Sequence, residues 1–322
     1  MVAATRRPSH LTGIMTSFDD CWFLTGATAS GKTAVGIELA RTLNAEIVSM
    51  DSMALFRRMN IGTAKPSMAE RAEIPHHLID VVEPYEDFSL AEFLNSAERV
   101  AADIQKRGNQ VLFVGGTPLY LKALLRGVFE GPPADWELRQ RWEAFAQEHG
   151  NTAMHAELAK VDPLTAMRLH PHDARRVVRA LEVFEKTGES ITRLQQQFDR
   201  ARSASECRVF VLNWPRETLV ERINARVDEM FARGWIDEAK LLIADGNPLS
   251  RTALQAVGYG EIVEHLGTHN SISETIERVK IRTRQFAKRQ LTWFRSLSEC
   301  RWLELSDRFD PKALADKIAQ SA

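Results

Sequence analysis

The chain has 322 residues, of which 44% are hydrophobic and 26% are charged, and its formal net charge is −1. This composition is ordinary for a soluble globular protein with room for one large domain or two. A nearly neutral chain excludes nucleic-acid binding through a global positive charge, so any nucleic-acid surface must be a local basic patch.

Residues 1–20 are mostly polar and contain Arg6-Arg7-Pro8, without an apolar stretch long enough for a signal peptide. We expect them to be a disordered extension. No segment approaches the length that a membrane span requires, so no membrane partner is expected. The three cysteines are far apart, which is typical of a reducing compartment. We therefore expect a cytoplasmic protein, and, since nothing suggests an obligate interface, a monomer.

A phosphate-binding motif follows the first apolar run, Cys21–Leu24, and precedes a helical apolar pattern. Small residues let backbone N–H groups close around phosphate oxygens, and the helix directs its positive end at the same anion. Lys32 supplies a point charge and Thr33 a hydroxyl for Mg²⁺. The chain therefore binds a di- or triphosphate, as nucleotide- and ATP-binding P-loop proteins do. The motif consists of Gly26, Ala27, Thr28, Ala29, Ser30, Gly31, Lys32 and Thr33.

Short apolar runs recur along the chain, and helical patterns follow them. This alternation predicts an α/β fold with a P-loop NTPase-like parallel sheet flanked by helices. Ligands of such sheets lie beyond the carboxyl ends of the strands, so the residues at those ends are candidates for the site. The predicted strands are Cys21–Leu24, Ile47–Met50, Leu78–Val82, Val111–Val114, Val209–Leu212 and Trp302–Leu305.

The strand signal disappears between residues 130 and 199, where the pattern is helical and charged. We predict an all-helical insertion domain there, carried by a core formed from residues 21–129 and 200–322. Within the insertion, Arg175, Arg176 and Arg179 lie within about one helical turn. They could bind phosphate, or they could be a solvated face paired with glutamates.

Two predicted strands end in polar residues that could carry chemistry. Asp51 follows the second strand and could accept a proton or hold a substrate group, or it could be an ordinary turn residue. Gly115-Gly116-Thr117 follows the strand at 111–114. The glycines suggest a close backbone approach to a ligand beside the Thr117 hydroxyl, or a plain tight turn. The missing acid at this strand end counts against an NTP-hydrolysing motor.

Two basic features lie in the C-terminal half. Arg222 and Arg226 are four residues apart and share one helix face. The segment from Arg278 to Arg295 contains seven basic residues and no acid, with apolar residues interleaved. A long helix with one basic face suits a nucleic-acid backbone, or its arginines could pair with the core.

Together these residues resemble the tRNA dimethylallyltransferases, also called tRNA isopentenyltransferases, from Phe23 to about Leu305. Within the matching segments, I-G-T-A-K-P and A-K-R-Q-L-T-W-F-R are far more specific to that family than the P-loop is. The motifs, in the family's order, are G-A-T-A-S-G-K-T (26–33), D-S-M-A-L-F-R-R-M-N-I-G-T-A-K-P (51–66), V-G-G-T-P-L-Y (114–120), H-P-H-D-A-R-R-V-V-R-A-L-E-V (170–183), A-V-G-Y-G-E (256–261) and T-R-Q-F-A-K-R-Q-L-T-W-F-R (283–295).

The resemblance implies transfer of a dimethylallyl group from dimethylallyl diphosphate to N6 of the adenosine just 3′ of the anticodon (position 37) in tRNA. The P-loop would then hold a leaving diphosphate, which explains the missing acid. By resemblance, Asp51 is the base. Lys32, Mg²⁺ on Thr33, and Arg226 would neutralise the departing diphosphate, and Thr117 would lie near the adenosine.

The resemblance also implies that the insertion grips the tRNA anticodon stem-loop. The positions similar to the family's tRNA contacts are Asp51, Ser52, Met53, Ala54, Thr117, Arg139, Arg175, Arg176, Val177, Val178, Arg179, Gln255, Ala256, Val257, Gly258, Tyr259 and Gly260. The chain departs from the family at four positions. Family members often carry Gln at Ala54, Tyr at Phe56, Asp at Asn60 and a basic residue at Gly260. Ala54 cannot hydrogen-bond a base edge.

Two other functions use part of the same pattern. A P-loop small-molecule kinase would explain the sheet, the phosphate loop and Asp51, but not I-G-T-A-K-P or the basic helix. A nucleotide-regulated RNA-binding module without catalysis would explain the basic helix, but it leaves Asp51 and Thr117 without a role.

Overall fold

The computed structural model describes residues 18–129, 131–195, 201–244, 246–268 and 271–321. The chain divides into two compact units. Among the described residues, one lies within residues 126–200, and the other joins residues 18–125 to those from 201 onward. The extension expected at residues 1–20 falls, as far as residue 17, outside the described residues.

The larger unit is built on a parallel sheet of six strands in the order β3-β2-β4-β1-β5-β6. Every neighbouring pair is parallel, which confirms the predicted α/β fold. The strands β5 and β6 come after residues 126–200 in the chain, so the smaller unit is inserted into the chain of the larger one. The strands are β1 (Trp22–Gly26), β2 (Ala45–Ser49), β3 (His76–His77), β4 (Gln110–Val114), β5 (Val209–Asn213) and β6 (Cys300–Glu304).

The strand predicted at Leu78–Val82 is wrong. The third strand is the pair His76–His77, and Leu78 and Asp80 have φ values of 58° and 57°, which extended backbone excludes. The apolar residues of this run instead cover the loop after β2. The N–H groups of Val81 and Val82 both donate to the Leu55 carbonyl, and Val82 forms an isolated bridge with Phe56.

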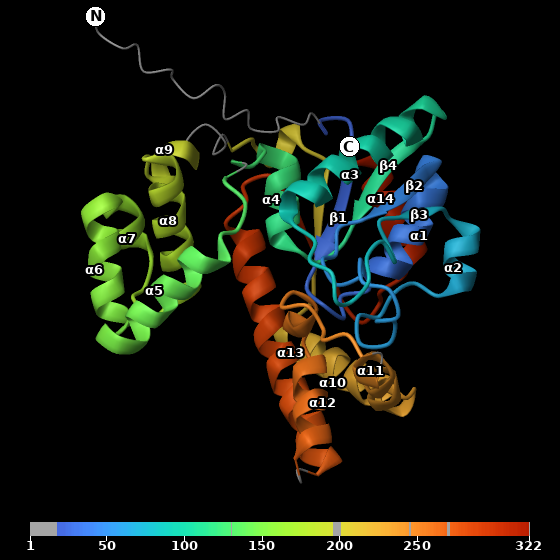
Figure 1. Cartoon of the computed structure of the whole chain (residues 1–322). Coiled ribbons are helices and arrows are strands. Elements are labelled where there is room, and N and C mark those ends of the chain that lie inside the picture. The colour runs from blue at the N-terminus through green and yellow to red at the C-terminus, as the bar shows by residue number, and fades with distance from the viewer. Residues whose placement is uncertain (1–17, 130, 196–200, 245, 269–270, 322) are drawn as a thin grey trace, which may run out of the picture. The chain divides into compact units, whose positions relative to one another are not determined.

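Helices cover both faces of the sheet (Figure 1). Leu24 and Leu112 pack on one face against α1 and α14, while Phe23 and Phe113 stack 5.1 Å apart on the other. On that second face α3 packs along β2 and β4 and meets α4. A sheet buried on both sides needs apolar residues at successive positions, which is the pattern of the strands. The helices are α1 (Lys32–Leu43), α3 (Leu90–Lys106), α4 (Pro118–Arg126) and α14 (Pro311–Gln320), with the short α2 (Met68–Glu73) between β2 and β3.

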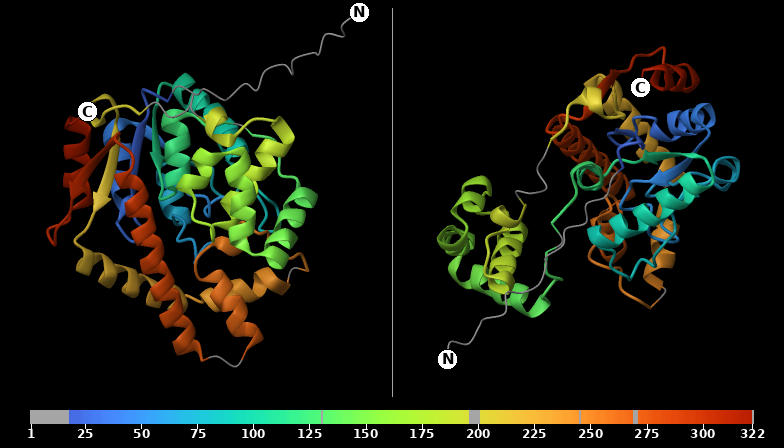
Figure 2. Two further views of the ribbon diagram at one scale, coloured as in Figure 1. Left: turned by 90° about the vertical axis from the view of Figure 1, so that its left-hand side faces the viewer. Right: turned by 90° about the horizontal axis from the view of Figure 1, so that it is seen from above.

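A second core of the larger unit lies beside the loop after β2. Its helices are α10 (Arg216–Ala232), α11 (Trp235–Ala244), α12 (Tyr259–Gly267) and α13 (Ile272–Arg295). Phe56 and Met59 of the loop pack there against Trp235 and Tyr259. The long helix α13 then reaches the sheet, where Ala287 joins the core of the sheet (Figures 1 and 2). Helix α13 therefore connects both cores.

The smaller unit is green to yellow in Figure 2, and its described residues from 131 to 195 contain helices and no strand. The helices are α5 (Trp136–His149), α6 (Asn151–Val161), α7 (Pro163–Arg168), α8 (Ala174–Thr187) and α9 (Ile191–Gln195). Met154 and Leu158 of α6 pack with Val177 and Leu181 of α8 in a core of its own. No described helix of the chain is long and apolar enough to cross a membrane.

Candidate active site

A cleft of about 840 Å³ lies in the larger unit, at the carboxyl ends of the strands. It brings together segments that are far apart in the sequence: the P-loop after β1, the segment 51–54 after β2 and the segment 115–117 after β4. Helix α10 adds Arg222 and Arg226. The sequence-predicted phosphate loop, base and strand-end threonine therefore share one cleft.

Two side chains hold the P-loop in place by donating hydrogen bonds to its backbone carbonyl groups. Trp214 Nε1 donates to Ser30 O at 3.0 Å, and Arg222 Nε donates to Ala29 O at 2.9 Å. The guanidinium of Arg222 also lies 4.6 Å from the Trp214 ring centroid. No side chain caps α1, so the N–H groups of its first turn remain available to an anion in the cleft.

Within the described residues Lys32 forms no ion pair, and its ammonium group is held by two backbone carbonyl groups. Its Nζ donates to Gly26 O at 3.0 Å and Ala27 O at 2.7 Å. Burial, together with the charge of Arg226 and against the opposing charge of Asp51, lowers the pKa of Lys32 to about 7. Burial also lowers the pKa of Arg226. Two desolvated cations at one end of a cleft favour a strongly anionic ligand.

Asp51 and Thr117 are positioned by the loops after β2 and β4. Asp51 Oδ1 accepts a hydrogen bond from the Met53 N–H at 2.9 Å, and within the described residues its other oxygen has no hydrogen-bond partner. Thr117 Oγ1 accepts from the Ser52 N–H at 3.0 Å and lies 3.3 Å from Ser52 Oγ. One carboxylate oxygen of Asp51 is therefore available to take a proton.

The paired glycines line the cleft and also allow close packing within the protein. A methyl group at Gly115 would lie 2.0 Å from Met50 O, and one at Gly116 would lie 2.7 Å from Gln290 Nε2. The absence of a side chain at Gly115 therefore lets the loop after β4 pack against the end of β2, and its absence at Gly116 makes room for Gln290 of α13. Gln290 was not recognised as a site residue from the sequence, although it lies within a family motif.

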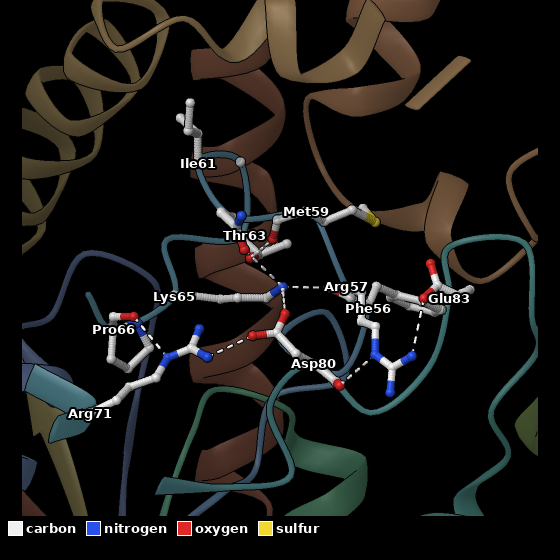
Figure 3. A network of polar contacts seen from close by, with 12 residues as sticks. Phe56, Arg57, Met59, Ile61, Thr63, Lys65, Pro66, Arg71, Asp80 and Glu83 are labelled. Carbon is white, nitrogen blue, oxygen red and sulfur yellow. Dashed lines mark hydrogen bonds and ion pairs between the residues drawn. The ribbon is translucent and has the colours of Figure 1, made fainter. Parts of the chain in front are cut away.

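The loop from Asn60 to Pro66 lines the cleft with its residues 62–66 and is fixed by a buried lysine (Figure 3). The Lys65 side chain is 1% exposed, and its Nζ donates to Asp80 Oδ1 at 2.6 Å and to the Phe56 carbonyl. Arg71 binds the other oxygen of Asp80 at 2.6 Å. Burial lowers the pKa of Lys65, although its bond to Asp80 favours the charged form. The polar contacts of Lys65 and Asp80 thus hold the segment I-G-T-A-K-P in place beside the cleft.

The same loop is anchored from its other side by Glu238 on α11. This carboxylate accepts hydrogen bonds from the N–H groups of Asn60 and Ile61, both at 2.8 Å, and of Gly62 at 3.3 Å. Tyr259 OH donates to it at 2.6 Å. Sequence reasoning missed Glu238, since an acid on an amphipathic helix has no signature of its own.

The segment 255–260 contributes unevenly to the cleft. Gln255, Ala256 and Val257 line it. Tyr259 is fully buried beside Trp235, so its side chain cannot contact tRNA in this structure. Gly258 is needed for packing, because a methyl group there would lie 2.0 Å from the Trp235 ring.

The four residues that depart from the family pattern fit their surroundings in the structure. Phe56, where the family often has Tyr, is fully buried in the second core. Asn60 Oδ1 accepts from Lys65 at 3.3 Å, so a neutral amide serves there. Ala54 is buried, and Gly260 is half-buried at the start of α12.

In the smaller unit, the expected tRNA-contacting residues fall into three groups. Val177 and Val178 are buried in its core, so their side chains cannot reach RNA in this structure. Arg139 and Arg179 both bind the fully buried Glu182, at 2.8 and 2.5 Å. Burial raises the pKa of Glu182, but these bonds outweigh it and hold the pKa below its ordinary value.

Arg175 and Arg176 form the third group and are exposed on α8. Arg176 pairs with Asp173 at 3.1 Å, whereas Arg175 has no hydrogen bond or ion pair within the described residues. Of the arginine cluster, these two residues are therefore the ones whose guanidinium groups are exposed enough to contact a phosphate backbone.

The basic helix α13 is mostly paired along its first half. Arg278 binds Glu264, Lys280 binds Asp228 at 2.8 Å, and Arg282 binds Glu261 at 2.8 Å. Arg284 donates to Asn224 at 2.6 Å. For these four residues the alternative that the basic side chains pair with the core is confirmed.

Known proteins resemble the chain over most of its length. Residues 54–297 match the family model of IPP transferases, and residues 20–83 match that of isopentenyl transferases. The tRNA dimethylallyltransferase of Rhodopirellula baltica is 47% identical over 294 residues, covering 89% of this chain and 88% of that protein. That of Geobacter metallireducens is 44% identical over 285 residues, covering 88% and 92%.

Solved structures agree with these sequence matches. The tRNA isopentenylpyrophosphate transferase of Bacillus halodurans has a TM-score of 0.67 at 37% identity, covering 94% of this chain and 96% of that one. A eukaryotic dimethylallyltransferase, captured acting on tRNA, has a TM-score of 0.73 at 28% identity, covering 93% and 77%.

Proposed function

Since this chain belongs to the tRNA dimethylallyltransferase family, we propose that it transfers a dimethylallyl group from dimethylallyl diphosphate to N6 of the adenosine 3′ of the anticodon (position 37) in tRNA. Diphosphate is the leaving group. The observation that carries the proposal is the cleft in which a phosphate loop with desolvated Lys32 and Arg226 adjoins the strand-end residues Asp51 and Thr117.

The cationic end of the cleft would bind the diphosphate and stabilise it as it departs. Lys32, Arg226 and the first turn of α1 supply positive charge that is already in place before the bond breaks. Thr33 also lines the cleft and offers a hydroxyl oxygen, which Mg²⁺ accepts together with phosphate oxygens. The ion would add neutralising charge to the leaving group.

Asp51 lines the same cleft, near enough to Lys32 and Arg226 to affect their pKa values, and would act as the general base. The exocyclic amine of adenosine is a poor nucleophile, so its proton must be removed as the carbon–nitrogen bond forms. The free carboxylate oxygen of Asp51 could take it, while the Oδ1 bond to Met53 keeps the carboxylate oriented. The base must leave the anticodon-loop stack to reach this position, and Thr117 would then lie beside it.

A P-loop small-molecule kinase, which the sequence also suggested, does not fit the family matches, and ligand-dependent melting tests the difference. We expect dimethylallyl diphosphate with Mg²⁺ to raise the melting temperature more than ATP with Mg²⁺ at equal concentration. A ligand at 100 times its Kd stabilises the folded state by about 2.7 kcal/mol, a shift that differential scanning fluorimetry resolves. Stabilisation by ATP with none by the prenyl donor would favour the kinase.

Arg175 and Arg176 should bind tRNA through phosphate contacts. Replacing both with alanine is expected to weaken tRNA binding and to reduce the slope of log Kd against log salt by about one unit per lost contact. The affinity for dimethylallyl diphosphate should not change. The control is Arg193→Ala, an exposed arginine of the same unit that pairs with Glu189.

The measurement is tRNA affinity across a salt series for both variants. An unchanged slope and affinity in the double variant would show that these arginines are a solvated face. Arg139 and Arg179 are left out because removing either would unbalance the buried Glu182 and disturb folding.

A further inference from the structure

The side chain of Gln290 lies between two loops of the cleft. Its Oε1 accepts a hydrogen bond from the Thr28 N–H at 2.9 Å, and its Nε2 donates to Gly116 O at 2.6 Å. A backbone N–H can only donate and a carbonyl can only accept, so one orientation of the amide satisfies both bonds. Gln290 is 4% exposed. A single buried amide therefore joins the P-loop to the loop after β4.

The contact at Gly116 leaves no space. A methyl group on Gly116 would lie 2.7 Å from Gln290 Nε2 and 3.6 Å from Lys32 Nζ. The loop after β4 therefore approaches Lys32 closely, and the Gln290 amide is its nearest neighbour there. Lys32, Gly116 and Gln290 all line the cleft, and Gln290 reaches it from α13.

The bonds of Gln290 continue to the proposed base. Gly116 precedes Thr117, whose hydroxyl oxygen accepts the Ser52 N–H at 3.0 Å. Ser52 follows Asp51 directly. At the other end, Thr28 lies in the same loop as Lys32. Hydrogen bonds and short backbone segments thus connect the diphosphate loop, through Gln290, to the segment that carries Asp51.

We propose that Gln290 is a positioning residue that sets the separation between the diphosphate loop and the segment carrying Asp51 and Thr117. The inference rests on the proposed function, which assigns the diphosphate loop to the prenyl donor and the segment with Asp51 and Thr117 to the acceptor adenosine. Group transfer requires the reacting carbon and nitrogen to approach to about 3–3.5 Å. A shift of one loop against the other therefore lowers the transfer rate, while each substrate keeps its own binding contacts.

The first test is Gln290→Met, which keeps the volume of the side chain and removes both hydrogen bonds. We expect kcat to fall about 10- to 100-fold, since a misplacement of 1 Å has an effect of this size. The Kd values for donor and for tRNA, measured by calorimetry without turnover, should each change by less than about threefold.

The matched control is Thr275→Val. Thr275 is equally buried on the same helix, lies away from the cleft, and donates to Ser271 O at 3.1 Å within its own helix. It should leave kcat unchanged, whatever its effect on the melting temperature. If Gln290→Met retains kcat, or if both variants lose kcat in proportion to their melting temperatures, the role is structural and the inference fails.

A second test uses the close contact at Gly116. Gly116→Ala should displace the Gln290 amide and lower kcat, but Gln290→Ala makes room for the added methyl group. The effect of Gly116→Ala on kcat should therefore be much smaller in the Gln290→Ala background than in the wild type. Strictly additive effects would overturn the inference. The proposed function fails separately, namely if the wild-type chain modifies no tRNA adenosine.

Discussion

Replacing Asp51 with alanine is expected to lower kcat by roughly 10²- to 10⁴-fold, the range that a general base contributes. The affinity for dimethylallyl diphosphate should not fall, because Lys32 and Arg226 remain and lose only a nearby negative charge, whereas the lost contribution belongs to proton transfer. Single-turnover kinetics with saturating donor and tRNA measures the chemical step directly.

Asp51→Asn refines this experiment. The amide oxygen can still accept the hydrogen bond from the Met53 N–H, so the turn is preserved while the basic oxygen is lost. We expect the asparagine variant to be nearly as slow as the alanine variant. Near-normal turnover in either variant would exclude Asp51 as the base.

Lys32→Met is expected to weaken donor binding and to slow the departure of diphosphate together. The removed ammonium contributes to a preorganised cationic site, for which the loss of one group costs about 10²- to 10³-fold in kcat. Isothermal titration with the donor and single-turnover rates together test this. Retention of both donor binding and prenylation, with loss of ATP binding alone, would contradict the assignment of Lys32.

The lowered pKa of Lys32 gives this variant a second signature. In the folded protein without ligand the pKa is about 7, below the ordinary value of 10.5. The unfolded chain therefore binds more protons between pH 7 and 10.5, and stability rises with pH across that window. Below pH 7 the buried charge destabilises the fold fully. Lys32→Met should therefore melt at a higher temperature than the wild type at pH 6, and the difference should shrink as the pH rises towards 10.

Local patterns predicted the parts of the fold that depend on local chemistry. The apolar runs marked five of the six strands to within two residues at each end, and the P-loop motif located the phosphate-binding end of the cleft. The run Leu78–Val82 was misread because an apolar pentapeptide can be buried as a turn as well as a strand. Its left-handed residues are held by contacts with the loop after β2, which lies more than twenty residues earlier.

Contacts between distant segments could not be predicted. The sequence shows an arginine cluster in the helical unit, but not that Arg179 shares the buried Glu182 with Arg139 from another helix. Likewise, nothing in the sequence pairs Gln290 with Thr28, which is 262 residues away. Such partners depend on the tertiary fold, so a motif identifies the residue without indicating which loop it holds.

The most direct test of the proposed activity is nucleoside mass spectrometry on an unmodified tRNA anticodon stem-loop incubated with the protein, Mg²⁺ and dimethylallyl diphosphate. The account predicts one N6-(dimethylallyl)adenosine at position 37 and release of diphosphate, with product formed roughly 10²- to 10⁴-fold more slowly when Asp51→Ala replaces the wild type. Absence of the modified nucleoside with the wild-type protein, or equal product from Asp51→Ala, would contradict it.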